Sequence, residues 1–196
     1  RRPTGAQDVE IVRMALSGSA NKRLVAELVN QGARAIGVSG EDAGLLSAMP
    51  LDPARLGRVG LPHEVDTALL GLLIGGGYLP VISPVSRNAS WSANDESLGS
   101  ALNVNGDDAA AAIAVAIGAS ELVFVADVPG VMSDGALVPR LDVRGARQLL
   151  AGGTAKGGMR AKLEAAIAAV EGGVAQVRIG DVAAIEDLTR GTTLAR

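Results

Sequence analysis

Three polar segments that contain glycine have the residue types needed to bind phosphate, and each lies beside an expected helix or strand end. They are residues 103–107, 127–135 and 152–158. The third segment carries Lys156 and leads into Lys162, while Arg2 stands near the start of the chain. A lysine suits a phosphoryl oxygen as a point charge, and an arginine suits a carboxylate. Because phosphoryl transfer depends mainly on positioning and charge stabilisation, this set of residues favours a phosphate-handling enzyme.

The stretch 101–135 places two of these segments around one helix and one strand. A loop of Asn, Gly and Asp opens an Ala-rich helix, a short apolar strand follows, and the next loop begins at Asp127. Asn103 or Asn105 could cap the helix, whose N-terminus suits an anion such as phosphate. Asp107 lies at the same end, where an acidic side chain is also favourable for the helix alone. Both the binding interpretation and the purely structural one remain open at this point.

The elements that must position these segments alternate along the chain. Helical spacing of apolar residues predicts helices over 8–16, 21–31, 64–75, 142–151, 159–171 and 182–189, and short apolar runs predict strands over 35–38, 78–84 and 175–179. Thr4 is the expected cap of the first helix, and Ser17-Gly18-Ser19 is expected to interrupt it. Residues 43–62 and 85–100 are expected to form loops or hairpins. This alternation predicts an α/β fold with a parallel sheet.

Composition excludes several classes of function. The 196 residues suffice for one domain or two closely joined lobes, and 48% of them are hydrophobic. The net charge of −3, without a basic run and with only 2% aromatic residues, argues against nucleic-acid binding. The sequence has no cysteine, no apolar run long enough for a membrane span and no signal-peptide pattern, so a cytoplasmic protein without a membrane partner is expected. It also contains neither a dinucleotide-binding nor a P-loop glycine motif, nor a metal-ligand cluster.

A resemblance to a known family adds to this interpretation. The ordered segments are RPT, SGSANKRLVAEL, AIGVSGEDAGL, LGRVG, GGYLPVISP, NVNGDDAAAAIA, ADVPGVMSDG and GGMRAKLEAA. Together they are similar to the N-acetylglutamate kinases of the amino acid kinase family, and the similarity extends from the first residue to GTTLAR at the end. One of these motifs alone would not be specific, but NVNGDD, DVPGV and GGMRAK in the correct order are.

The resemblance implies a reaction and an architecture. ATP would phosphorylate the γ-carboxylate of N-acetyl-L-glutamate, giving an acyl phosphate for arginine biosynthesis. The expected fold is a three-layer α/β/α sandwich around a largely parallel sheet. Residues 1–100 would be the remainder of the lobe that binds the amino acid and forms a homodimer, or a higher oligomer, and residues 101–196 would be the nucleotide-binding lobe.

The resemblance also implies roles for individual residues. Arg2 would bind a substrate carboxylate, and Asn103 would bind the acetylglutamate. Asp107 would orient the catalytic lysines, and Lys162 would stabilise the transferring phosphoryl group. The residues that would contact ATP are Asp127, Val128, Pro129, Gly130, Val131, Met132, Thr154, Ala155 and Lys156. Mg²⁺ would bridge the ATP phosphates, and no metal ligand is assigned to the protein.

Two departures from the family pattern affect these expectations. The family's first strand, with a catalytic lysine and glycine-rich loops, would precede Arg2 and is not in this sequence. We therefore expect the natural polypeptide to be longer, or this fragment to aggregate, because a sheet without that strand exposes unpaired edges. In addition, Asn105-Gly106-Asp107 stands where the family usually has Asn-Ala-Asp.

Other interpretations of the same residues stay open. A kinase of acetylated or carrier-bound aminoadipate in lysine biosynthesis would share these motifs, and so would a non-catalytic regulatory module that binds a nucleotide. Lys162 could be a solvated helix lysine, Asp127 could serve only in a turn, and Arg2 could be an unordered terminal residue.

Overall fold

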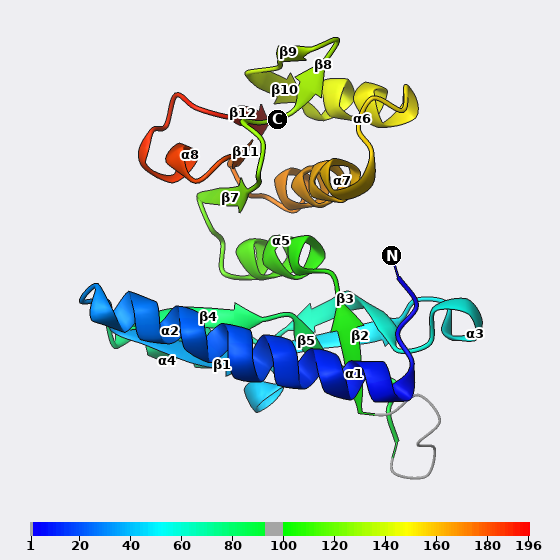
Figure 1. Ribbon diagram of the computed structural model, residues 1–196, viewed down its shortest axis with the longest axis vertical. Helices are drawn as coiled ribbons and strands as arrows, with labels where there is room; N and C mark the ends of the chain where they lie inside the picture. Colours follow the sequence, from blue (N-terminus) through cyan, green and yellow to red (C-terminus); the bar gives the residue numbers. More distant parts are fainter. Residues whose placement is uncertain (1, 93–99) are drawn as a thin grey trace. The chain divides into compact units, whose positions relative to one another are not determined.

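The chain folds into two compact units, Arg1–Ala109 and Ala110–Arg196. The computed structural model describes residues 2–92 and 100–196, and Figure 1 shows the elements of each unit. Part of the loop or hairpin that we expected over 85–100, positions 93–99, lies outside the described residues. The boundary between the units falls within helix α5 (Gly106–Ala116).

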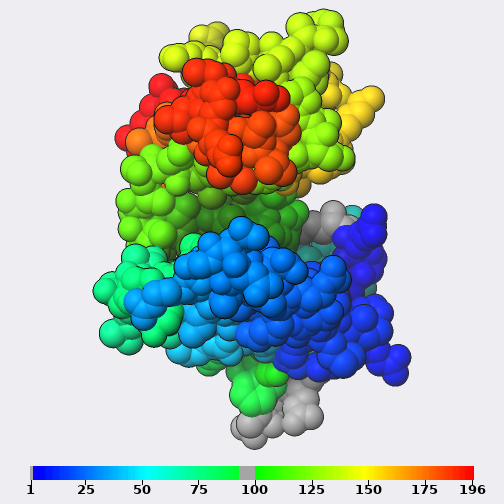
Figure 2. Space-filling model, turned by 60° about the vertical axis from the view of Figure 1, so that its left-hand side comes forward, coloured from blue at the N-terminus to red at the C-terminus, as the bar shows by residue number. Residues whose placement is uncertain are grey.

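Unit 1 begins with one long helical segment, seen in blue in Figures 1 and 2. It consists of α1 (Ala6–Val12), η1 (Arg13–Ala20) and α2 (Asn21–Asn30), which follow one another without a break. The predicted interruption at Ser17-Gly18-Ser19 is therefore wrong. Instead, these residues form a π-helix, a rare widening of the helix that is frequent at functional sites. Ser17 uses its hydroxyl in tertiary contacts, because its Oγ lies 2.6 Å from Oγ of Ser83.

The start of this helical segment also differs from the prediction. Gly5, not Thr4, is the N-cap residue, and its N–H donates to the carboxylate of Asp8 at 2.8 Å. Thr4 instead forms a parallel β-bridge with Gly57. Thr4 therefore belongs to a strand-like contact and not to the helix.

The strands of unit 1 form a parallel pair and a small closed barrel. Strand β1 (Ala35–Ser39) pairs in parallel with β4 (Leu79–Ser83). The barrel has the strand order β2-β3-β6-β5, and these strands are β2 (Leu46–Pro50), β3 (Val59–Val65), β5 (Val85–Asn88) and β6 (Ala101–Val104). Short helices η2 (Asp42–Gly44) and α3 (Pro53–Leu56) lie in the connections, and α4 (Ala68–Gly75) precedes β4. The predicted helix over 64–75 begins later than expected because Glu64 and Val65 pair with β2.

Unit 2 is built on a four-stranded mixed sheet with the order β10-β12-β11-β7. Its strands are β7 (Glu121–Val125), β10 (Arg140–Asp142), β11 (Gln176–Gly180) and β12 (Thr192–Ala195). Strands β7 and β11 are parallel, and β12 is antiparallel to β11. A small hairpin, β8 (Met132–Ser133) and β9 (Ala136–Leu137), lies between β7 and β10 in the sequence. The α/β class predicted from the sequence is therefore confirmed.

Helices complete unit 2 and bury its core. They are α6 (Val143–Ala151), α7 (Gly157–Glu171) and α8 (Ala183–Glu186). Leu163 and Val170 of α7 are fully buried together with Val177 and Ile179 of β11. The last helix is shorter than the predicted range 182–189, because Asp187 accepts hydrogen bonds from Thr189 and starts a turn.

A helix that crosses a lipid bilayer must be both long and apolar. Within residues 2–92 and 100–196, no helix combines the length and the apolar character that a membrane crossing needs.

Candidate functional site

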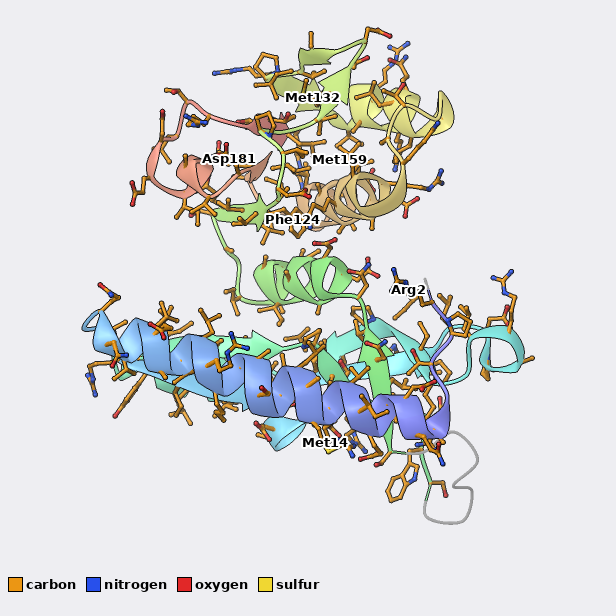
Figure 3. The ribbon with its side chains drawn as sticks, viewed as in Figure 1. Arg2, Met14, Phe124, Met132, Met159 and Asp181 are labelled. Carbon is orange, nitrogen blue, oxygen red and sulfur yellow. The ribbon has the colours of Figure 1, made fainter. Side chains whose placement is uncertain are left out.

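The candidate substrate residues of unit 1 lie around Thr4. The backbone of Thr4 donates to Leu56 O at 3.0 Å and accepts from Arg58 N at 2.8 Å, which fixes the segment that carries Arg2. The side chain of Asn103 donates to Thr4 Oγ1 at 3.1 Å. Arg2, two residues before Thr4, is exposed to solvent (Figure 3). The structure thus brings Asn103 to the segment of Arg2 through Thr4, a contact that sequence reasoning missed because it treated Thr4 as a helix cap.

The N-terminus of α5 is capped by Asn105 and not by Asn103. Asn105 Oδ1 accepts a hydrogen bond from the Asp107 backbone N–H at 2.8 Å, and Asn105 O accepts from Ala109 N at 2.9 Å. This leaves Asn103, on β6, free to bond Thr4. Asp107 is half-buried in the first turn of the helix. Asn105 therefore has a structural role, whereas the side chain of Asn103 lies in the candidate substrate region.

The loop Asp127–Met132 leaves the carboxyl end of β7. Ala126 N donates to Gly180 O at 2.7 Å, which extends the pairing with β11 up to the start of the loop. Farther along, Val131 is buried and its carbonyl accepts from Val138 N at 2.9 Å. The exposed part of the loop is therefore held at both ends, at the edge of a sheet where α/β proteins commonly bind ligands.

The segment Gly152–Gly158 leads directly into α7. Lys156 is the N-cap residue, and the helix begins at Gly157, two residues before the predicted start. Gly157 has φ = +53°, a conformation that glycine adopts without a steric penalty. Ala155 is buried, while Thr154 and Lys156 on either side of it are exposed. The buried alanine anchors the segment, and its exposed neighbours are available to a ligand.

Lys162 lies over an aromatic ring of β7. Its Nζ is 5.7 Å from the centre of the Phe124 ring, within the range of a cation–π interaction (Figure 3 labels Phe124). Phe124 comes three residues before Asp127, so α7 and the loop after β7 share this contact. Phe124, the single phenylalanine of the chain, was not among the predicted site residues. No pattern along the sequence indicates which strand faces Lys162.

The predicted site residues are divided between the two units. Arg2, Asn103 and Asp107 belong to unit 1, and Lys162 belongs to unit 2 together with both ATP segments. Among the residues that the structure describes, no cluster of three or more histidine, cysteine, aspartate or glutamate side chains could hold a metal ion.

Two ion pairs that lie outside these segments each shift the pKa of one of their members. Arg178, only 3% exposed, binds both carboxylate oxygens of Glu121, and its Nη1 also donates to Ala184 O. The hydrogen bond from Arg178 lowers the pKa of Glu121, and one from Gln176 adds to it. In unit 1, the hydrogen bond to Glu41 raises the pKa of Arg13. Both pairs join neighbouring elements, so we assign them structural roles.

Comparison with known proteins finds relatives that match most of the chain. The profile of the amino acid kinase family matches residues 2–181. The chain is 44% identical over 188 residues to an acetylglutamate kinase of Chloroflexus aurantiacus, an alignment that covers 95% of this chain and 71% of the relative. It is 43% identical over 178 residues to an acetylglutamate kinase of Geobacillus kaustophilus, covering 91% of this chain and 66% of the relative.

A solved structure extends the comparison to the fold. The crystal structure of smu.665 from Streptococcus mutans UA159 has a TM-score of 0.86 to this chain at 25% identity, and the match covers 98% of this chain and 73% of that one. The family profile spans nearly all of the chain, and the relatives share its sequence from one unit into the other. The chain belongs to the amino acid kinase family.

Proposed function

We propose that this protein transfers the γ-phosphoryl group of ATP to the γ-carboxylate of N-acetyl-L-glutamate, giving N-acetylglutamyl phosphate for arginine biosynthesis. The observation that carries the proposal is the 44% identity to an acetylglutamate kinase over 95% of this chain. The ordered loops at the carboxyl end of β7 and at the start of α7 support it, because they offer glycines and lysines for phosphate binding.

On the substrate side, Arg2 and Asn103 are the groups that bind the acetylated amino acid. Arg2 is exposed, and a guanidinium pairs well with a carboxylate through two parallel hydrogen bonds. Asn103 is half-buried, and its amide already donates to Thr4 Oγ1, which fixes the orientation of its side chain. Both residues belong to unit 1, so we assign recognition of the amino acid to this unit.

On the nucleotide side, the loop Asp127–Met132 and the segment Thr154–Lys156 bind ATP, which assigns this role to unit 2. The exposed Lys156 stands at the N-cap of α7, where free N–H groups and the helix dipole also favour an anion. Mg²⁺ would be held mainly by the phosphates of ATP, because this ion usually keeps several waters and is bound through substrate phosphates. When bound, it reduces the negative charge on the phosphates.

Lys162 stabilises the phosphoryl group during the transfer. An oxygen of the γ-carboxylate attacks the γ-phosphorus, while the bond from that phosphorus to the bridging oxygen of ADP breaks. Negative charge shifts among the phosphoryl oxygens, and an ammonium held in place stabilises this transition state more than the ground state. Asp107 would orient this lysine through a charge-assisted hydrogen bond.

We also propose that two copies of unit 1 form a homodimer. Its long helical segment carries exposed apolar side chains, among them Ile11, Met14, Leu24 and Val29. Met14, 65% exposed, projects from η1 (Figure 3). Exposed apolar surface of this kind marks interaction sites when it is contiguous.

Sedimentation of the wild type and of Met14→Glu tests the dimer. We expect the wild type to be a dimer and Met14→Glu to weaken it. A monomeric wild type would contradict the proposal.

A coupled assay of ADP release tests the proposed reaction. The full-length polypeptide is given MgATP with N-acetyl-L-glutamate or with its analogue that is one carbon longer, N-acetyl-aminoadipate. We expect a higher kcat/KM for acetylglutamate. A preference for the longer acid would instead indicate the lysine-biosynthesis kinase, and no acceptor-dependent ADP release would indicate a non-catalytic nucleotide-binding module.

A further inference from the structure

We propose that Thr192 is a positioning residue that fixes the loop Asp127–Met132 in the conformation that binds the nucleotide. The inference rests on the proposed function, which gives this loop to ATP. Thr192 lies far from the loop in the sequence and was not among the predicted site residues.

The hydroxyl of Thr192 joins two backbone groups on either side of the β8–β9 hairpin. Thr192 is fully buried at the first position of β12. Its Oγ1 accepts a hydrogen bond from Val131 N at 2.8 Å and donates one to Val138 O at 2.6 Å. Val131 and Val138 are also bonded to each other, since Val138 N donates to Val131 O at 2.9 Å. One hydroxyl therefore closes a small network that ends the candidate nucleotide loop.

The loop backbone also approaches Thr192 more closely than a side chain would permit. Gly130 has φ = +156°, and a β-carbon built on it would lie 2.8 Å from Thr192 Oγ1, 3.0 Å from Thr192 N and 2.7 Å from Leu137 Cδ1. A glycine is needed at this position because anything larger would collide with Thr192 and with Leu137. The loop conformation and the position of Thr192 thus depend on each other.

The position of Thr192 is itself fixed by the sheet. Thr192 pairs with Ile179 of β11, and β11 pairs on its other edge with β7, the strand that leads into the loop. Gly191, just before it, has φ = +90°, and a β-carbon there would lie 2.6 Å from Ile179 O. The loop is consequently anchored to β11 directly, through Ala126 N and Gly180 O, and indirectly, through Thr192 of β12, which pairs with β11.

Removal of the hydroxyl would leave the buried Val131 N–H without its acceptor. A buried donor without a partner is unfavourable, so the loop would leave this conformation to find another partner or water. The isosteric Thr192→Val variant keeps the volume and β-branching of threonine but cannot bond Val131 or Val138. Thr192→Ser keeps the hydroxyl and should restore both contacts. Thr193→Val is the matched control, because Thr193 is the next residue of β12 and is only half-buried.

The test measures amide hydrogen exchange at Val131 and the dissociation constant for MgATP by calorimetry. For Thr192→Val we expect exchange to be faster, and the dissociation constant larger, by at least about tenfold each. Thr192→Ser and Thr193→Val should remain close to the wild type in both measurements. If Thr192→Val does not fold, Thr192→Ala is used in its place. It also removes the hydroxyl, but it puts no methyl group where the hydroxyl was.

The possible results separate this inference from the proposed function. Unchanged ATP affinity and unchanged exchange in Thr192→Val, with a wild type that binds ATP, would overturn the role of Thr192 alone. Faster exchange with unchanged affinity would overturn it as well, because the hydroxyl would then only support the fold. A folded wild type that binds no ATP would contradict the proposed function and, with it, any nucleotide role of Thr192.

Discussion

The ammonium nitrogen of Lys162 lies 5.7 Å from the centre of the Phe124 ring. Phe124 is buried on β7, and Lys162 is half-buried in α7. The ring face attracts the ammonium group, and such contacts are worth about 0.5–2 kcal/mol. The contact restricts Lys162 to a position beside the strand that leads into the loop Asp127–Met132. It also argues against a purely solvated helix lysine.

The first prediction concerns Lys162. In the full-length polypeptide, Lys162→Ala should lower kcat by at least about a hundredfold, with a smaller change in KM, because it removes an interaction made mainly in the transition state. Lys156→Ala should mainly raise the KM for ATP, since Lys156 is exposed at the N-cap of α7. Arg160→Ala is the control, because Arg160 is an exposed partner of Glu164 on the same helix. A near-normal kcat for Lys162→Ala would show that the role assigned to Lys162 is wrong.

The second prediction concerns Arg2. Arg2→Ala should raise the KM for N-acetyl-L-glutamate about tenfold or more, because it removes a charge-assisted hydrogen bond to a carboxylate. The KM for ATP should change little. Arg55→Ala is a suitable control, since Arg55 is an exposed arginine of unit 1 that pairs with Asp52. An equal effect of Arg2→Ala on both substrates would count against a specific carboxylate contact.

The third prediction concerns the cap of α5. Asn105→Ala removes the acceptor of the Asp107 N–H and should lower the free energy of unfolding by about 1 kcal/mol. It should also lower kcat, because Asp107 would no longer be held in place by the first turn. Asn105→Asp keeps the acceptor and should be close to the wild type in stability. Urea denaturation of the three proteins makes the comparison, and equal stability of Asn105→Ala and the wild type would refute the cap.

The cap of helix α5 shows what the sequence could predict and what it could not. The residues concerned are Asn103, Asn105 and Thr4. The pattern located helix α5 and limited its cap to two asparagines, because capping depends on residues next to each other in the chain. It could not choose between them, since the choice depends on the contact of Asn103 with Thr4 from a distant segment. The same limit explains the error at Ser17-Gly18-Ser19. Local propensity predicts a break there, but the tertiary contact of Ser17 with Ser83 accompanies a continuous π-helix.

Periodicity also identified helices better than it identified buried faces. Strands β1, β4 and β11 lie close to the strands predicted over 35–38, 78–84 and 175–179, and β7 is the apolar strand expected before the loop at Asp127. These predictions succeeded because short runs of apolar residues have few alternatives in an α/β fold. In α4, however, helical spacing does not distinguish the buried leucine from the exposed one, because Leu72 is 76% exposed while Leu70 is buried. This helix is apolar nearly all round, so its sequence does not define one buried side.

The fourth prediction concerns the pH dependence of folding. The pKa of Glu121 is lowered in the folded state by Arg178, so the unfolded state binds a proton first as the pH falls. The stabilisation by this pair is therefore complete above the ordinary glutamate pKa of about 4.3 and is lost as the pH falls below it towards the folded-state pKa. Glu121→Gln should destabilise the protein by about 3 kcal/mol at pH 7, because it leaves the buried Arg178 without its counter-charge.

The control for this prediction is Glu164→Gln. Glu164 pairs with Arg160 in an exposed pair on α7, and such pairs contribute about 0.3–0.5 kcal/mol. Urea denaturation between pH 3 and pH 7 should show a steeper loss of stability for the wild type than for Glu121→Gln. Parallel pH profiles for these two proteins would contradict the assignment to Glu121.

The most direct test of the proposed activity is detection of its product. The full-length polypeptide is incubated with MgATP and N-acetyl-L-glutamate in the presence of hydroxylamine, which traps an acyl phosphate as a hydroxamate that mass spectrometry identifies. We predict the hydroxamate of N-acetylglutamate in an amount that matches the ADP formed, and at least about a hundredfold less with Lys162→Ala. ADP formation by the wild type without this hydroxamate, or an equal yield from Lys162→Ala, would contradict the account.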